Sequence, residues 1–329
     1  MFLQFLLLLS ASQVLLLLLS PRYKSRFILK WYYNHVVIPV LKDNNRYRWK
    51  FHVVPLFYLS LYMYIIYMYY AYIRNPILPY LYTIEDVLLI PLFLIAIIAT
   101  GLLTMFIRPK SSLDQDVDYP YRYRYDRIIF FPDIVCRTCH VVKPARSRHC
   151  GICNRCVLLQ DHHCIWANNC IGQGNFLYFY LFLVLNTVAL IYGFVKLIVL
   201  QLFFGVKLPK IALTISILCG TLGVLCAVFT YMQLSLVRDG MTTNEQEKWY
   251  VIQEYMRAKE LFRTASNEYF ILKDSPKGAG DRKEFYSVNP YDDKIYRLRD
   301  DPLMVERAEE IINIYDKGSF WENLKEICF

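Results

Sequence analysis

Charged side chains are scarce in this chain of 329 residues. Only 20% of the residues are charged, whereas 56% are hydrophobic, and the mean hydropathy is +0.27. This balance excludes a set of soluble domains, which the length alone would allow. It favours a membrane protein that crosses the bilayer several times, because about 20 consecutive apolar residues are enough for one span.

Five segments are apolar and long enough to span a bilayer, so we expect an all-α polytopic membrane protein with about five transmembrane helices. The segments are 2–20, 53–73, 87–107, 176–204 and 211–236. The predicted division of the chain is an N-terminal span (1–20), a basic loop (21–52), spans two and three (53–107), a cysteine-rich region (108–175), spans four and five (176–236) and a C-terminal tail (237–329).

The sequence lacks the marks of a cleaved signal peptide and of a nucleic-acid-binding protein. No cation precedes the first apolar run, and no small-x-small cleavage site stands before the flank at Pro21, so we expect this run to stay as a span. The net charge of +9 comes with no nucleic-acid motif. We interpret it as cations beside the membrane that meet anionic lipid.

Lysine and arginine concentrate in two of the loops. Eight lie between the first two spans and ten between spans three and four, while the other two loops carry few. Because cationic loops stay in the cytosol, we expect a lumenal N-terminus, with the cysteine-rich region and the tail in the cytosol.

Seven cysteines and four histidines fall within the 35 residues from Cys136 to Cys170. Thiols stay reduced on a cytosolic face, so these cysteines are interpreted as metal ligands or nucleophiles and not as disulfides. Three C-x2-C pairs are typical of zinc knuckles, and His149 and His163 are available to complete Cys3His sets. The spacing predicts zinc sites in this region.

Eleven candidate ligands are more than two closed tetrahedral sites can use, since those take eight. Three candidates must therefore be free, and His140, directly after a knuckle cysteine, is interpreted as a solvated loop residue. The remaining free groups should include a thiol that an imidazole and a carboxylate can activate. If Cys164 is that thiol, His162 is its base, Asp161 orients the base, and His163 points the opposite way as a ligand.

Two other functions compete with a cysteine nucleophile. A zinc-folded membrane adaptor without catalytic activity would need the ligands but not Asp161 or His162. A membrane zinc hydrolase would need a metal with an open coordination position, and eight well-spaced ligands for two ions leave none open. The complete set of acid, base and thiol favours the enzyme over both alternatives.

At Asp161-His162-His163-Cys164 the chain resembles the DHHC protein S-acyltransferases, or palmitoyltransferases. The family pattern C-x2-C-x9-H-C-x2-C-x2-C-x4-D-H-H-C-x5-C-x4-N-x3-F is complete here, up to Phe179. Thr242-Thr243-Asn244-Glu245 matches the family's TTxE motif. The run from Asn313 to Gly318, followed by Asn323, matches its conserved C-terminal motif.

The resemblance implies two structural zinc ions with closed ligand sets. It places the first on Cys136, Cys139, His149 and Cys156. It places the second on Cys150, Cys153, His163 and Cys170. The groups left without metal are then His140, His162 and Cys164.

The resemblance also implies roles for residues outside the ligand sets. Thr243 should hydrogen-bond Asp161, and Trp166 should line the mouth of an acyl cavity whose far end lies near Ala189, about seven helical turns past Cys164. In the alternative interpretation, Trp166 is an interfacial anchor, and Thr242 and Thr243 only cap a helix.

Two positions depart from the family pattern. Ile165 replaces the usual proline after the motif cysteine, and no DPG motif is recognisable in "IRPKSSLD". Together with the additional N-terminal span, these departures look most like the fungal Swf branch. That resemblance implies the endoplasmic reticulum membrane and SNARE-type substrates.

The implied reaction is a ping-pong transfer of palmitate. Cys164 takes the acyl chain from palmitoyl-CoA and passes it to a cysteine of a membrane protein beside the bilayer. Both steps are thioester exchanges, so neither ATP nor a redox cofactor is needed. Four cations are candidate contacts for the CoA phosphates, or alternatively a surface that faces lipid: Lys143, Arg146, Arg148 and Arg155.

Overall fold

The computed structural model describes residues 12, 13, 15–23, 26–42, 46–114, 122–274, 283–298 and 301–329. The chain divides into two compact units, Met1–Tyr58 and Leu59–Phe329. In the first unit, α2 (Phe27–Tyr32), η1 (Tyr33–Val37) and α3 (Ile38–Lys42) follow one another as a continuous helical stretch. The predicted first span, 2–20, falls largely outside the described residues.

Four helices of the described part are long and apolar enough to cross a membrane. They confirm the four predicted spans that lie within that part and the polytopic fold class. The first consists of α4 (Lys50–Met68), η2 (Tyr69–Ile73), α5 (Arg74–Ile77) and η3 (Leu78–Tyr80), and the second of η4 (Glu85–Leu89) and α6 (Ile90–Phe106). The third and fourth are α7 (Phe176–Leu202) and α8 (Lys210–Arg238).

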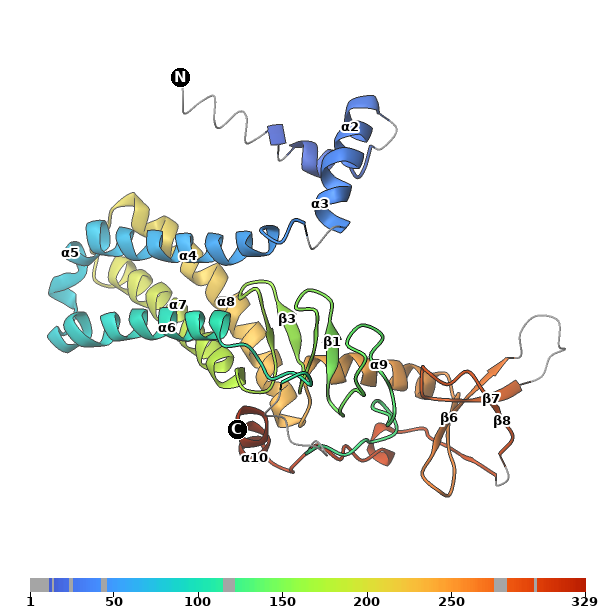
Figure 1. Cartoon of the computed structure of the whole chain (residues 1–329). Helices are drawn as coiled ribbons and strands as arrows, with labels where there is room; N and C mark the ends of the chain where they lie inside the picture. The colour runs from blue at the N-terminus through green and yellow to red at the C-terminus, as the bar shows by residue number, and fades with distance from the viewer. Residues whose placement is uncertain are drawn as a thin grey trace. The chain divides into compact units, whose positions relative to one another are not determined.

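The helices α6, α7 and α8 lie side by side (Figure 1). Hydrogen bonds between polar side chains join the spans. Apolar contacts alone do not select which helices pair in a bilayer, because lipid tails are as apolar as the side chains. The hydroxyls of Thr187 on α7 and Thr230 on α8 are 3.0 Å apart, and the Tyr62 hydroxyl donates to the carbonyl of Leu94 at 2.8 Å. These bonds fix which faces of the helices meet.

Two short hairpins make up the regular structure of the cysteine-rich region. Strand β1 (Arg148–Cys150) pairs with β2 (Arg155–Val157), and β3 (His162–Cys164) pairs with β4 (Asn169–Ile171), both antiparallel. The second hairpin is tied to the end of α6, whose last carbonyls have no partner within the helix. Asn169 Nδ2 donates to the carbonyls of Thr104 at 3.0 Å and Ile107 at 2.8 Å, and Asn175 Nδ2 donates to Ile107 at 3.0 Å.

The tail contains two helices and a sheet. Helix α9 (Thr243–Arg257) is capped by Thr242, which forms a capping box with Glu245, and α10 (Phe320–Cys328) packs against α7 and α8. Sequence analysis did not predict the five-stranded antiparallel sheet between them. Its order is β8 (Ile295–Tyr296), β7 (Lys283–Ser287), β6 (Tyr269–Asp274), β5 (Leu261–Arg263) and β9 (Leu303–Met304).

A buried ion pair joins the cysteine-rich region to the tail. Arg146 and Glu245 have side chains that are each 1% exposed, and two N–H groups of the guanidinium donate to the carboxylate at 2.6 and 2.7 Å. A third bond, at 3.0 Å, goes to the carbonyl of Gly240. The rings of Tyr123 and Tyr315 lie 4.9 and 4.6 Å from the guanidinium carbon. Every face of the arginine is therefore occupied.

Gly240 ends α8 and allows the tail to pass close by. Its φ of +64° lies in the left-handed region, and a Cβ atom here would be 2.7 Å from the Cα of Asp316. Only glycine combines this backbone conformation with such a close approach. The turn between α8 and α9 is thus held by Arg146 on one side and by the C-terminal segment on the other.

We expect Glu245→Gln to destabilise the fold strongly, because it leaves the Arg146 charge buried without a counter-charge, at a cost of about 3–5 kcal/mol. The neighbouring pair Arg148–Glu247 provides a matched control, since its side chains are 52% and 60% exposed. Glu247→Gln should change the melting temperature of the detergent-solubilised protein little. Equal melting temperatures for the two variants would contradict this account of the core.

Candidate active site and metal centres

Two groups of four side chains bring their sulfur and nitrogen atoms together, each within 4.8 Å of one another. The first group is Cys136, Cys139, His149 and Cys156. The second is Cys150, Cys153, His163 and Cys170. Their membership equals the two ligand sets that the sequence resemblance implied.

The distances within both groups fit tetrahedral zinc. Zn–S bonds of about 2.3 Å and Zn–N bonds of about 2.0 Å at tetrahedral angles place sulfur about 3.5 Å from nitrogen. His149 Nδ1 lies 3.6, 3.2 and 3.9 Å from its three sulfurs, and His163 Nδ1 lies 3.6, 3.4 and 3.7 Å from its own. Three thiolates and one imidazole are also donors that zinc prefers.

The local fold explains how each group assembles. The amide of Cys139 donates to Cys136 Sγ, and the amide of Cys153 donates to Cys150 Sγ, both at 3.4 Å, as in zinc knuckles. His140 adopts a φ of +59° in the turn after the first knuckle and belongs to neither group. In each hairpin the histidine stands opposite a cysteine of its own group, His149 across from Cys156 and His163 across from Cys170.

Strand β3 separates the two adjacent histidines. Successive side chains of a strand point to opposite faces, so His162 and Cys164 share one face while His163 occupies the other. His163 joins the second metal group, whereas His162 bonds Asp161. In the strand only alternate residues need to meet.

The carboxylate of Asp161 is buried and fully engaged. Its Oδ2 lies 2.6 Å from His162 Nδ1 and accepts the Thr243 hydroxyl at 2.9 Å, while its Oδ1 accepts the amide of Thr243 at 2.6 Å. Thr243 is the first residue of α9, whereas the neighbouring Thr242 caps that helix. Thr243 therefore makes the hydrogen bonds to Asp161 that the family resemblance implied, whereas Thr242 is the helix cap of the alternative interpretation.

The electrostatics of this line suit a nucleophile and its base. Burial lowers the pKa of His162, but its hydrogen bonds with Asp161 and Cys164 raise the pKa by more than burial lowers it. The pKa of His162 therefore rises to about 10. Burial raises the pKa of the Cys164 thiol, yet the His162 hydrogen bond and charge, with the amides of Ala167 and Trp166, bring that pKa below its ordinary value. Both shifts act in the direction of a thiolate beside an imidazolium.

Apolar groups surround the pair on the membrane side. The ring of Phe179, near the start of α7, contacts the His162 ring edge-on with centroids 5.6 Å apart. Trp166 is 51% exposed in the turn after β3. Farther along α7, Ala189 lines a largely apolar cavity of about 450 Å³ between the spans, together with Ile65, Leu94 and others.

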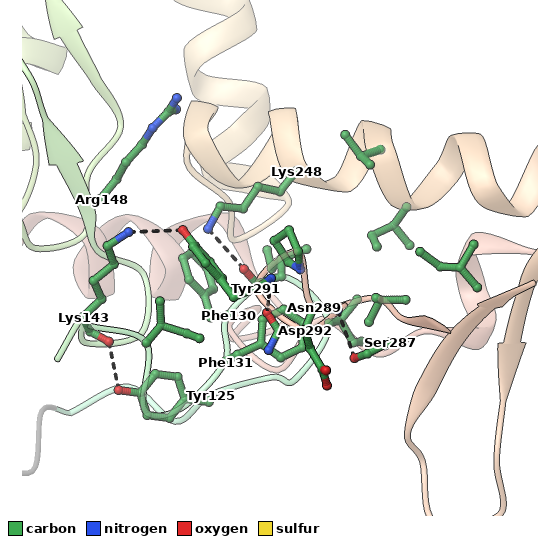
Figure 2. A pocket seen from close by; sticks show the side chains of 18 of the residues that line it. Tyr125, Phe130, Phe131, Lys143, Arg148, Lys248, Ser287, Asn289, Tyr291 and Asp292 are labelled. Atoms are coloured by element: carbon green, nitrogen blue, oxygen red, sulfur yellow. Dashed lines mark hydrogen bonds between the residues drawn. The ribbon is translucent and has the colours of Figure 1, made fainter. Parts of the chain in front are cut away.

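A second cavity, of about 690 Å³, lies beside α9 and contains two of the four predicted CoA contacts. Figure 2 shows Lys143, Arg148 and Lys248 around it, with the Lys143 ammonium donating to the Tyr291 hydroxyl at 3.2 Å. Lys248 lies over the ring of Phe130, and burial lowers its pKa to about 8.

The other two predicted CoA contacts do not line this cavity. Arg155 lies on β2, opposite Cys150. Arg146 is 1% exposed and is enclosed by Glu245 and two tyrosine rings, so a phosphate cannot reach it, and it is not among the proposed CoA contacts. Arg146 lies among other basic residues in the sequence, which predicted an exposed cation. Its structural role is to form the buried ion pair with Glu245, a residue far away in the chain.

Sequence reasoning also missed groups that hold the site in place. The side chains of Asn169 and Asn175 fasten the β3–β4 hairpin to α6, and Lys248 lies beside the cation cavity. Asn175 belongs to the family sequence pattern, so its importance could have been predicted from the sequence. Asn169 and Lys248 had no signal, because their partners come from distant segments.

The comparisons with known proteins agree with this geometry. The sequence pattern of the DHHC palmitoyltransferase family matches residues 129–250. The chain is 45% identical over 323 residues to palmitoyltransferase SWF1 of Saccharomyces cerevisiae, covering 95% of this chain and 96% of the relative. It is 45% identical to palmitoyltransferase SWF1 of Candida glabrata, covering 96% of each. Palmitoyltransferase ZDHHC5-B of Danio rerio is 41% identical over 147 residues, which cover 42% of this chain and 22% of the relative.

Near-complete coverage at this identity, together with the two metal groups and the Asp161-His162-Cys164 line, assigns the family and the branch. The protein belongs to the DHHC palmitoyltransferase family, in the branch of the fungal SWF1 enzymes.

Proposed function

We propose that the protein moves palmitate from palmitoyl-CoA to cysteines of membrane proteins through an acyl-Cys164 intermediate. The observation that carries this proposal is the arrangement on β3, where Cys164 and His162 share one face and Asp161 bonds the imidazole. The adaptor alternative would need none of these three groups, and the relatives are named as enzymes.

In the first step, the Cys164 thiolate attacks the thioester carbon of palmitoyl-CoA. The new S–C bond forms, the bond to the CoA sulfur breaks, and the His162 imidazolium donates its Nε2 proton to the leaving thiolate. Asp161 stays ionised, holds the ring by Nδ1 and stabilises its positive charge before this proton leaves.

In the second step, a cysteine thiol of the protein substrate gives its proton to neutral His162. Its thiolate attacks the acyl-enzyme, and the Cys164 thiolate leaves, paired again with an imidazolium. Donor, intermediate and product are all thioesters, so the two steps balance without ATP or a redox partner. What the site contributes is proton transfer and the close placement of two sulfur atoms.

The membrane spans and the cation cavity supply the binding sites for the two parts of the donor. We place the acyl chain between the spans, with Trp166 at the entrance and Ala189 near the far end, where a largely apolar cavity is present. We place the CoA phosphates near Lys143 and Arg148, which lie together beside α9. Arg155 remains a further candidate on β2.

Two zinc ions are proposed to occupy the two Cys3His groups as structural ions. All four positions of each would be taken by protein ligands, so neither would hold a reacting water. What these groups do for the chain is fix both hairpins, and with them the direction of the β3 side chains.

The cellular setting follows from charge and resemblance. We propose that the N-terminus faces the lumen of the endoplasmic reticulum and that the cysteine-rich region and tail face the cytosol. The cysteine-rich region is one of the two cation-rich loops, which stay in the cytosol, and the tail lies two spans farther on and so on the same side. Substrate cysteines would then lie in cytosolic segments beside a transmembrane helix, as in SNARE-type proteins. The domain boundaries given above are proposed on the same basis.

We expect Cys164 to carry a hydroxylamine-labile acyl group after incubation with palmitoyl-CoA, detected by peptide mass spectrometry. Cys164→Ser should carry none, and His162→Ala should form the acyl-enzyme about 10²- to 10⁴-fold more slowly, because it loses the imidazolium that stabilises the Cys164 thiolate and protonates the leaving CoA thiolate. Cys328→Ser, which removes a thiol from α10, outside the cysteine-rich region, should behave as wild type. A label that persists in Cys164→Ser would refute the proposed nucleophile.

The adjacent histidines should differ in metal content. Elemental analysis should find two zinc ions per chain in the wild type, Cys164→Ser and His162→Ala, because none of these changes removes a proposed ligand. His163→Ala should release metal and lose thermal stability, since binding of structural zinc contributes directly to the free energy of folding. If the two histidine variants have equal zinc contents and melting curves, the proposed separation of roles is wrong.

Acyl-chain preference should depend on Ala189. Ala189→Tyr fills part of the cavity, so autoacylation measured with acyl-CoAs of fourteen to twenty carbons should shift toward shorter chains without a change in zinc content. Each methylene that no longer fits forfeits roughly 0.8 kcal/mol of burial. The wild type should tolerate chains longer than sixteen carbons. An unchanged chain-length profile in the variant would show that the acyl chain does not reach this position.

A further inference from the structure

Gln233 lies on α8 close to the active site and has no role in the reaction described so far. Its side chain is buried, with 4% of the residue exposed, and its Nε2 donates to the hydroxyl oxygen of Thr243 at 3.2 Å. That hydroxyl is the one that donates to Asp161 Oδ2 at 2.9 Å. The amide is thus three hydrogen bonds away from the ring nitrogen of His162, with Thr243 and Asp161 between them.

The direction of the protons along this line follows from the chemistry of its members. An ionised carboxylate only accepts hydrogen bonds, so the single proton of the Thr243 hydroxyl must point to Asp161. The hydroxyl oxygen can then only accept from its other neighbour. Gln233 meets that requirement because it presents its N–H₂ group and not its carbonyl oxygen.

The remaining atom of the amide supports this assignment. Gln233 Oε1 is buried and has no hydrogen-bond partner among the described residues. An unpaired buried oxygen is unfavourable. Exchanging the two amide atoms would give the oxygen a partner but leave the nitrogen unpaired in its place, and it would draw the Thr243 proton away from Asp161. The Asp161 carboxylate requires the Thr243 proton, and this requirement fixes the orientation of the Gln233 amide, whose Oε1 stays unpaired.

We propose that Gln233 is a positioning residue for acyl transfer, which orients the Thr243 hydroxyl toward Asp161 and thereby fixes the carboxylate that holds His162. This inference rests on the proposed acyl-Cys164 mechanism. It connects the last turns of a membrane span to the catalytic base, because Gln233 belongs to α8 while Thr243 begins α9. No group of Gln233 needs to touch the acyl donor or the acceptor.

The test uses Gln233→Met, which keeps the length of the side chain and removes both polar groups. Autoacylation of the full-length protein by palmitoyl-CoA should slow about 3- to 10-fold, as expected for the loss of one oriented hydrogen bond. The loss should fall on kcat, with KM for palmitoyl-CoA unchanged. A mere defect in the packing of the spans, where the acyl chain is proposed to bind, would raise KM instead.

A double-mutant cycle shows whether Gln233 acts through the threonine. Thr243→Val removes the hydroxyl, so adding Gln233→Met to it should slow autoacylation by less than about 2-fold further. Thr243→Ser keeps the hydroxyl and should keep the full effect of Gln233→Met. Losses that multiply in the Thr243→Val background would overturn the proposal, as would a wild-type rate for Gln233→Met.

Two further variants guard against a trivial loss of folding. Thr230→Val removes a buried hydrogen bond one turn earlier on the same helix and should leave kcat unchanged. Gln233→Leu removes both polar groups with a side chain of a different shape, so it should slow autoacylation about as much as Gln233→Met. Zinc content and melting temperature normalise each rate to folded protein. Wild-type kcat in both Gln233 variants would overturn the proposal.

Cys164→Ser in the same assay distinguishes failure of the proposed acyl-Cys164 mechanism from failure of the proposed role of Gln233. If it still forms the labile acyl group, the proposed mechanism fails. If it is inactive while Gln233→Met matches the wild type, the mechanism stands and only the role of Gln233 is refuted.

Discussion

The alternation of side chains along β3 is the constraint on which the chemistry of this protein depends. His163 is turned into a group with three cysteine sulfurs, and this contact fixes the rotation of the strand about its own axis. His162 and Cys164 are thereby both directed to the opposite face, where they meet. By holding His163, the second Cys3His group therefore orients His162 and Cys164 on either side of it. The motif needs two adjacent histidines because they serve opposite faces of one strand.

The face that carries the thiol is completed by residues from far along the chain. Asp161 receives two hydrogen bonds from Thr243, and that residue is kept in reach by the buried pair of Arg146 and Glu245, which belong to the same two segments. Removing two charges from water is costly unless their geometry is good. Two short bonds, a third to a carbonyl and two aromatic rings meet that condition here. The pair thus specifies how α9 docks, in addition to what it contributes to stability.

Several of these features could be predicted from sequence, and the reason differs between them. The four spans in the described part follow from composition, since a bilayer demands long apolar helices whatever their neighbours are. The eight metal-group residues follow from short-range spacing and the family resemblance, because a knuckle is a local structure. Arg146 shows the limit of such reasoning. Its partner lies 99 residues away, so a basic motif residue was assigned to a phosphate when it belongs to the core.

The short strands of the tail sheet show the same limit, because their pairing lies in contacts between segments and not within any one of them. The active site itself has this composite character. The end of α6 receives Asn169 and Asn175, the end of α8 leads through Gly240 into α9, and the hairpin that carries Cys164 lies between these two attachments. A thioester whose acyl chain enters the membrane must keep its carbonyl carbon near the interface. Fastening the proposed nucleophile to the ends of the spans sets its depth relative to the bilayer, which a separately folded zinc domain on a flexible linker would not do.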